Sequence, residues 1–167
     1  MKISEIKKLF LYGMIFALFA SLYYLNILQF IGCKRLDCLL VISYGVVDID
    51  RIKHLIPVLF WILPQIILTN QMGDYLSRNL NKNAVYIFTR TSERKSWMIG
   101  KIVTLFFYVF IYYAVQFIVM SVCGILIGFD ILFIDFKAIL SMFFLIVLYN
   151  YTFILMINIF SLYVKAI

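Results

Sequence analysis

Long apolar runs without charge alternate along this chain with shorter segments that hold almost every charged residue. A helix needs roughly 20 apolar residues to cross a bilayer. Runs of about that length cover residues 9–32, 55–73, 102–129 and 138–164. The second run contains Pro64, which we expect to kink its helix. The pattern predicts an all-α fold, a polytopic membrane bundle of four transmembrane helices in a single transmembrane domain over residues 1–167.

Composition and charge place this bundle in a membrane with a defined orientation. The chain has 65% hydrophobic and 14% charged residues, whereas a soluble domain has about 25% charged residues. With the N-terminus inside, ten of the 15 Lys and Arg residues and three of the eight acidic residues lie on the inner side. This asymmetry predicts a bacterial cytoplasmic membrane protein with both termini in the cytoplasm. The net charge of +7 then suits the anionic inner leaflet, and we expect no nucleic-acid partner.

Two segments outside the long runs also carry an apolar pattern. Ile3, Ile6 and Phe10 recur at helical spacing among lysines, which predicts an amphipathic N-terminus. It is either a short helix on the inner membrane surface or the basic flank of the first span. The outer loop contains a nine-residue apolar run, 39–47, which is too short to span. This run could lie at the interface, re-enter the membrane or form a small outer cap.

The predicted spans offer little for catalysis, because they contain no Asp, Glu, His, Lys or Arg. Ionisable groups inside a membrane are costly and usually functional. The single histidine, His54, stands at a span edge beside Lys53 and has no partner for a metal site. We therefore expect no enzymatic activity, no cofactor and no metal in this chain. Cys33 and Cys38 could form a local disulfide outside the cell or remain two free thiols.

The spans do contain neutral polar side chains and patterned small residues. The polar side chains either hold the helices together or line a substrate path: Asn26, Gln29, Gln65, Gln116, Asn150 and Asn158. Small residues let helix backbones approach closely, within one chain or between two copies. Two sets are predicted to do so, one in the first span and one G-x-x-x-G in the third: Gly13, Ala17 and Ser21, and Gly124 and Gly128.

The inner loop, 70–101, is far longer than a connection between two spans requires. Its first part has an apolar stripe that predicts a cytoplasmic helical extension of the second span. A break at 79–83 and a short apolar element at 85–88 follow. Thr91 or Ser92 is then expected to cap a helix that runs through Trp97 into the third span. The loop is therefore predicted to be largely helical.

The run from Ile87 to Trp97, IFTRTSERKSW, followed by Gly100-Lys101, resembles the first cytoplasmic loop of bacterial ABC-2-type exporter permeases. Its Phe-Thr-Arg and Lys-Ser-Trp are similar to those of the DUF2705 group of permease-like membrane proteins. The family usually has Pro where Thr91 stands, and it usually has six spans. The resemblance therefore implies a shortened member or a fragment.

The resemblance implies a membrane-spanning permease subunit of an ABC transporter, an exporter. The loop would be the coupling element that docks on a separate ABC ATPase subunit, since the chain has no phosphate-binding G-x-x-x-x-G-K-[ST] loop of its own. The coupling residues would be Tyr86, Ile87, Phe88, Arg90, Arg94, Lys95 and Trp97. A homodimer or a second permease subunit would complete the path. The alternative is a non-transporting membrane interaction protein, such as an immunity or sensor-partner subunit.

The charge asymmetry makes a direct prediction about Ser92, which the proposed orientation places in the cytoplasm. In a cysteine-free background, Ser92→Cys should resist a membrane-impermeant maleimide in intact cells and react after permeabilisation. A cysteine in the outer segment 34–54 is the matched control, and it should react in intact cells. Labelling of Ser92→Cys in intact cells would refute the orientation.

Overall fold

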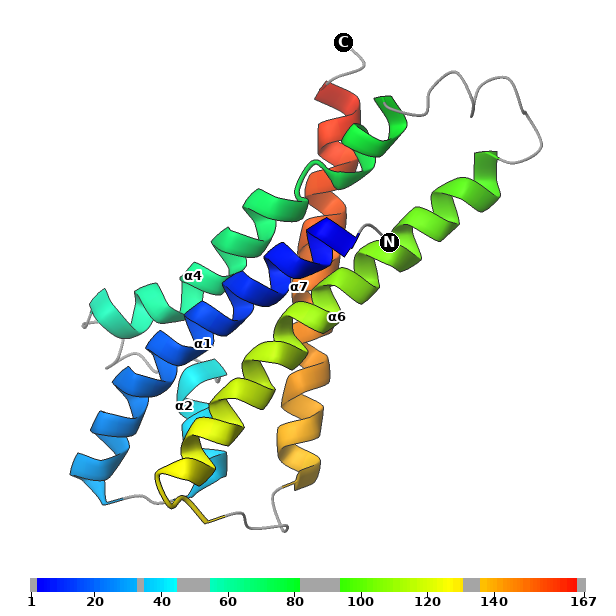
Figure 1. Ribbon diagram of the computed structural model, residues 1–167. Coiled ribbons are helices and arrows are strands. Elements are labelled where there is room, and N and C mark those ends of the chain that lie inside the picture. The colour runs from blue at the N-terminus through cyan, green and yellow to red at the C-terminus, as the bar shows by residue number, and fades with distance from the viewer. Residues whose placement is uncertain (1–2, 33–34, 45–54, 82–93, 131–135, 165–167) are drawn as a thin grey trace.

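The computed structural model describes residues 3–32, 35–44, 55–81, 94–130 and 136–164 (Figure 1). Its helices are α1 (Ile3–Ile31), α2 (Leu36–Tyr44), α4 (Leu55–Met72), α6 (Arg94–Leu126) and α7 (Phe136–Val164). A further short helix, 75–81, follows α4 after a turn. Four helices are long and apolar enough to cross a membrane. The predicted all-α bundle with four membrane-spanning helices is therefore confirmed.

The parallel pair of α1 and α6 forms the centre of the arrangement. Figure 1 shows the two helices side by side, with α4 beside α1 and α7 behind α6. α1 and α6 bury a larger share of their spans than α4 and α7 do. Large apolar side chains on the outer faces remain exposed, among them Phe19, Phe160 and Leu145. Such faces suit contact with lipid, because the hydrocarbon core requires no polar covering.

The amphipathic start of the chain is the first part of α1. The helix begins at Ile3 and continues without interruption to Ile31. Ile6 packs against the buried core, whereas Lys7 and Lys8 are exposed. Of the two interpretations of this segment, the structure therefore has the basic flank of a span and not a separate surface helix.

The small residues of the first span lie at its closest approach to α6. A Cβ atom on Gly13 would stand 3.2 Å from the backbone oxygen of Tyr112. Ala17 and Ser21, one and two helical turns further on, are also almost fully buried. A small-residue face permits close packing of helices where lipid supplies no hydrophobic driving force. This face packs within the chain, against α6.

The G-x-x-x-G of the third span has a different role from the one we expected, because α6 ends between its two glycines. Gly128 has a φ of 90°. The Phe129 amide donates to the Gly124 carbonyl at 3.0 Å, and the Gly128 amide donates to the Ile125 carbonyl at 3.0 Å. This pair of bonds is a Schellman motif, in which a glycine with positive φ terminates a helix. Gly128 is exposed, and no described residue lies within 4 Å of its Cβ position, so it packs against no other described helix of this chain.

Gly124, in contrast, lies at a helix contact. A Cβ atom there would stand 2.7 Å from Leu36 Cδ1 and 3.3 Å from Leu39 Cδ2. The glycine thus lets α2 lie directly on the last turns of α6. The span predicted to reach residue 129 is accordingly shorter, with its helix ending at Leu126.

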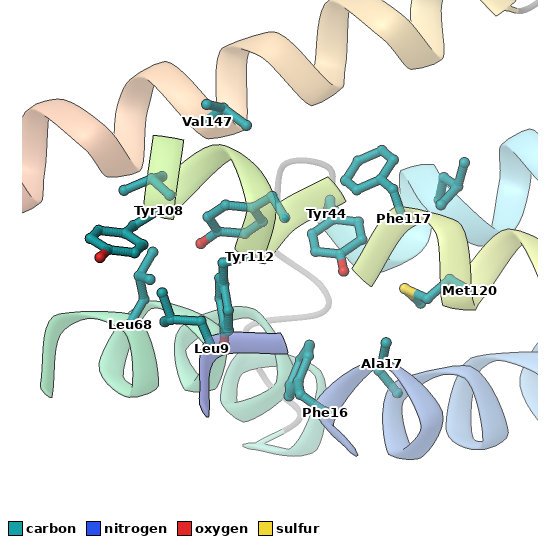
Figure 2. Packing of buried hydrophobic residues seen from close by; sticks show 14 of the residues in the cluster. Leu9, Phe16, Ala17, Tyr44, Leu68, Tyr108, Tyr112, Phe117, Met120 and Val147 are labelled. Atoms are coloured by element: carbon teal, nitrogen blue, oxygen red, sulfur yellow. The ribbon is translucent and has the colours of Figure 1, made fainter. Parts of the chain in front are cut away.

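Aromatic side chains fill much of the interior. Tyr108, Tyr112 and Tyr113 of α6 are among the largest fully buried side chains. Figure 2 shows Tyr44 of α2 beside Phe117 of α6, and their rings stack at a centroid distance of 4.7 Å. Aromatic pairs of this kind add roughly 0.5–1.5 kcal/mol beyond the area that they bury.

Gly13→Leu should destabilise the bundle, because the nearest obstacle to its side chain is the backbone of Tyr112 and not a flexible side chain. Overpacking of this kind costs about 1–3 kcal/mol. We expect a lower midpoint of thermal unfolding in detergent. Gly100→Leu is the matched control, since Gly100 also lies in a helix but meets nothing within 4 Å. Equal midpoints for the two variants would contradict the α1–α6 contact.

Candidate functional site

Two helical segments of the described structure lie within the predicted coupling loop, 70–101, or continue from it. Helix 75–81 leads into this loop, and α6 leads out of it from Arg94. Tyr86, Ile87, Phe88 and Arg90, predicted to be coupling residues, lie outside the described residues, and so does the side chain of Arg94. The helical extension predicted after the second span is present as helix 75–81.

The remaining two predicted coupling residues stand in the first turns of α6. The Lys95 side chain is exposed and that of Trp97 is half-buried. The Lys101 Nζ atom lies 5.8 Å from the centre of the Trp97 ring, within the range of a cation–π contact. Trp97 and Lys101 therefore belong to one patch at the entrance to the span.

Asn158 of α7 joins α4 to helix 75–81. Its side chain is fully buried. The Nδ2 atom donates to the Met72 carbonyl at 2.7 Å, and the Oδ1 atom accepts from the Leu76 amide at 2.8 Å. Carbonyls at the end of one helix and amides at the start of the next have no partner within their own helix. Asn158 satisfies one carbonyl and one amide of this kind, so α7 fixes the direction of helix 75–81.

Most of the short apolar run 39–47 lies in α2, which packs inside the bundle, and residues 45–47 lie outside the described residues. α2 contacts α1, α4, α6 and α7, and its Leu39 and Leu40 are fully buried. Figure 1 shows it enclosed by the long helices at the end of the bundle where α1 ends and α7 begins. Of the three alternatives for this run, the structure therefore favours a re-entrant helix over an interfacial helix or an outer cap.

The C-terminal end of α2 lies deep between the spans. The Tyr44 hydroxyl donates to Gln116 Oε1 at 2.8 Å. Gln116 stands ten residues before the end of α6 at Leu126, which corresponds to about 15 Å at about 1.5 Å per residue. The hydrocarbon core of a bilayer is about 30 Å thick. If α6 spans it, Tyr44 reaches approximately the middle of the membrane.

A cluster of buried polar side chains surrounds this end of α2, and we call it the midplane cluster: Tyr44, Tyr113, Gln116 and Asn150. All four are at most 9% exposed. The Tyr113 hydroxyl and the Gln116 Nε2 atom have no hydrogen-bond partner among the described residues. An unsatisfied buried polar group costs about 1–3 kcal/mol. The cluster therefore retains hydrogen-bonding capacity that the bundle does not use.

The six neutral polar residues considered for a substrate path fall into three groups. Asn26 and Gln29 are exposed near the end of α1. Gln65 is half-buried, and its Nε2 atom donates to the Trp61 carbonyl at 3.4 Å. Gln116, Asn150 and Asn158 are buried. Gln116 and Asn150 belong to the midplane cluster, whereas Asn158 connects helices.

Sequence reasoning missed the tyrosines. Tyr108 donates to Glu5 Oε2 at 3.0 Å, and Tyr112 donates to the Pro64 carbonyl at 3.2 Å. These bonds link α6 to α1 and to α4. The signal was available, because Tyr108, Tyr112 and Gln116 recur every four residues and so share one face of the third span.

The described residues contain no group of three or more His, Cys, Asp or Glu side chains that could hold a metal ion. Comparison of the chain with protein-family models, with curated proteins and with solved structures found no match.

Asn158→Leu should weaken the connection between α7 and helix 75–81, because it leaves the Leu76 amide and the Met72 carbonyl without this partner. We expect a loss of roughly 1–2 kcal/mol of unfolding free energy and faster amide exchange in helix 75–81. Asn26→Leu is the control, since Asn26 is exposed and bonds only to the Leu22 carbonyl of its own helix. Unchanged exchange in helix 75–81 would contradict this role of Asn158.

Proposed function

We propose that this chain is the membrane-spanning permease subunit of an ABC transporter, an exporter, coupled to a separate ATPase subunit. It would lie in the bacterial cytoplasmic membrane, with both termini and the loop 70–101 in the cytoplasm. The observation that carries the proposal is the pair of helical segments, 75–81 and the start of α6, on either side of the loop that resembles a coupling element. Both segments continue from helices long and apolar enough to span a membrane.

The lengths of these helices support a lever between the loop and the spans. α6 has 33 residues and is therefore about 50 Å long, whereas the hydrocarbon core is about 30 Å thick. Its first turns would project into the cytoplasm. A push on the loop would then act directly on α6, and through Asn158 on α7. Rocking of helices of this kind is the usual basis of alternating access.

The filled interior of one chain supports an assembly of two permease subunits. α2 and the buried tyrosines of α6 occupy the space between the spans. A path would thus run between this chain and a second copy or a second permease subunit. A filled interior also suits the alternative, a membrane interaction protein that does not transport, and binding of an ATPase separates the two functions.

Truncation of two apolar residues in the loop tests the docking. Ile87→Ala with Phe88→Ala should release a candidate ATPase encoded beside this gene, since anchors of this type typically contribute above about 2 kcal/mol each to an interface. Membrane insertion should persist, because it depends on the spans. The measurement is recovery of the ATPase with the tagged chain from detergent-solubilised membranes.

Ile99→Ala with Val103→Ala is the matched control for this experiment. Both side chains are large, apolar and exposed on α6, and they lie outside the short apolar element at 85–88. The control should recover as much ATPase as the parent. Equal recovery with the parent and the loop double variant would rule out docking through Ile87 and Phe88, and failure of the parent to bind any ATPase would favour the non-transporting alternative.

A further inference from the structure

The two ends of α2 are attached to the bundle in different ways. At the outer end, the Leu36 amide donates to the Asp130 carbonyl at 3.2 Å, and the side chains of Leu36 and Leu39 lie against Gly124. At the inner end, the contacts of Tyr44 with other described residues are made by its side chain, through its hydrogen bond to Gln116 and its stack on Phe117. Backbone pairing and close packing thus fix the outer end more firmly than the tip.

The side chains packed around the tip of α2, its C-terminal end at Tyr44, carry more polar groups than Tyr44 can satisfy. Tyr44 occupies Gln116 Oε1, whereas Gln116 Nε2 and the Tyr113 hydroxyl lie near Tyr112 and Asn150 but make no hydrogen bond of ordinary geometry among the described residues. Asn150 of α7 is buried near Tyr113. The arrangement in which Tyr44 contacts Gln116 therefore leaves polar atoms without hydrogen bonds, at a cost in free energy that water would remove.

We propose that α2 is a displaceable plug, hinged at Leu36 against Gly124, whose tip withdraws from the midplane cluster and admits water to Tyr113 and Gln116. The plug closes because Tyr44 stacks on Phe117 and bonds to Gln116. It opens because hydration satisfies the polar atoms that the closed state leaves unpaired. This inference goes beyond the proposed function: the plug controls entry of water into the bundle of one chain, whereas the proposed substrate path runs between two subunits.

Accessibility of Ser43, next to the tip, tests the plug. Ser43 is 6% exposed, and its hydroxyl donates to the Leu39 carbonyl of its own helix. In a background in which all native cysteines are replaced, we would measure the rate at which a small, positively charged methanethiosulfonate, added outside, modifies Ser43→Cys. Ser21→Cys is the matched control, since Ser21 is 1% exposed on α1 and also bonds within its own helix.

The plug predicts a specific order of rates. Tyr44→Phe keeps the ring but removes the bond to Gln116, so the Ser43→Cys rate should rise about two- to tenfold, the range set by loss of one hydrogen bond. Adding Gln116→Leu should bring the rate back toward that of the parent, because the contact between residues 44 and 116 then has no polar atom to hydrate and the Tyr113 hydroxyl alone remains. The Ser21→Cys rate should stay unchanged in all three backgrounds.

Two results would overturn the plug. If Ser43→Cys remains as unreactive as Ser21→Cys with and without Tyr44→Phe, α2 is a fixed part of the core. If the rates at both positions rise together, the substitutions loosen the whole bundle. The labelling rates can be measured without an ATPase or a cargo. They can therefore refute the plug without refuting docking through the cytoplasmic loop, and a failed docking experiment would leave the plug unaffected.

Discussion

The close contact between α1 and α6 is the interaction on which the rest of this bundle depends. Gly13 brings the two backbones together at Tyr112, and a bulky side chain there would separate them. Near that contact, two tyrosine hydroxyls of α6 donate hydrogen bonds to other helices. Tyr108 donates to Glu5 on α1, and Tyr112 donates to the Pro64 carbonyl on α4. Since lipid provides no hydrophobic force between helices, close packing and these hydrogen bonds hold the spans together.

Polar groups inside the bundle serve two different purposes. Asn158 uses both ends of its amide to connect α7, α4 and the extension that leads into the cytoplasmic loop. The midplane cluster, in contrast, leaves the buried Tyr113 hydroxyl and Gln116 Nε2 without a hydrogen-bond partner in the part of the chain that the structure describes. A fully satisfied group gives rigidity, whereas an unsatisfied one favours states that admit a partner. The rigid connection faces the proposed ATPase side, and the unsatisfied cluster lies beneath α2.

Sequence reasoning was strongest where a pattern has one physical interpretation. Apolar runs of spanning length predicted the four long helices, and the spacing of Gly13, Ala17 and Ser21 predicted a packed face. Sequence reasoning was weaker where one pattern has two physical interpretations. The glycines at 124 and 128 fit a helix contact, but Gly128 terminates the helix with a positive φ. The likeness of residues 87–97 to a coupling loop remains a prediction, since most of that run lies outside the described residues.

The sequence by itself determined that this chain forms membrane-spanning helices, because a long apolar segment in lipid must satisfy its backbone hydrogen bonds internally. Only the tertiary structure decided what the neutral polar residues do. Asn150 and Asn158 stand eight residues apart in α7 and look equivalent in the sequence, yet Asn158 meets a helix break and Asn150 lies near Tyr113. The partner of a polar side chain is set by which helix packs opposite it, and local sequence does not encode that choice.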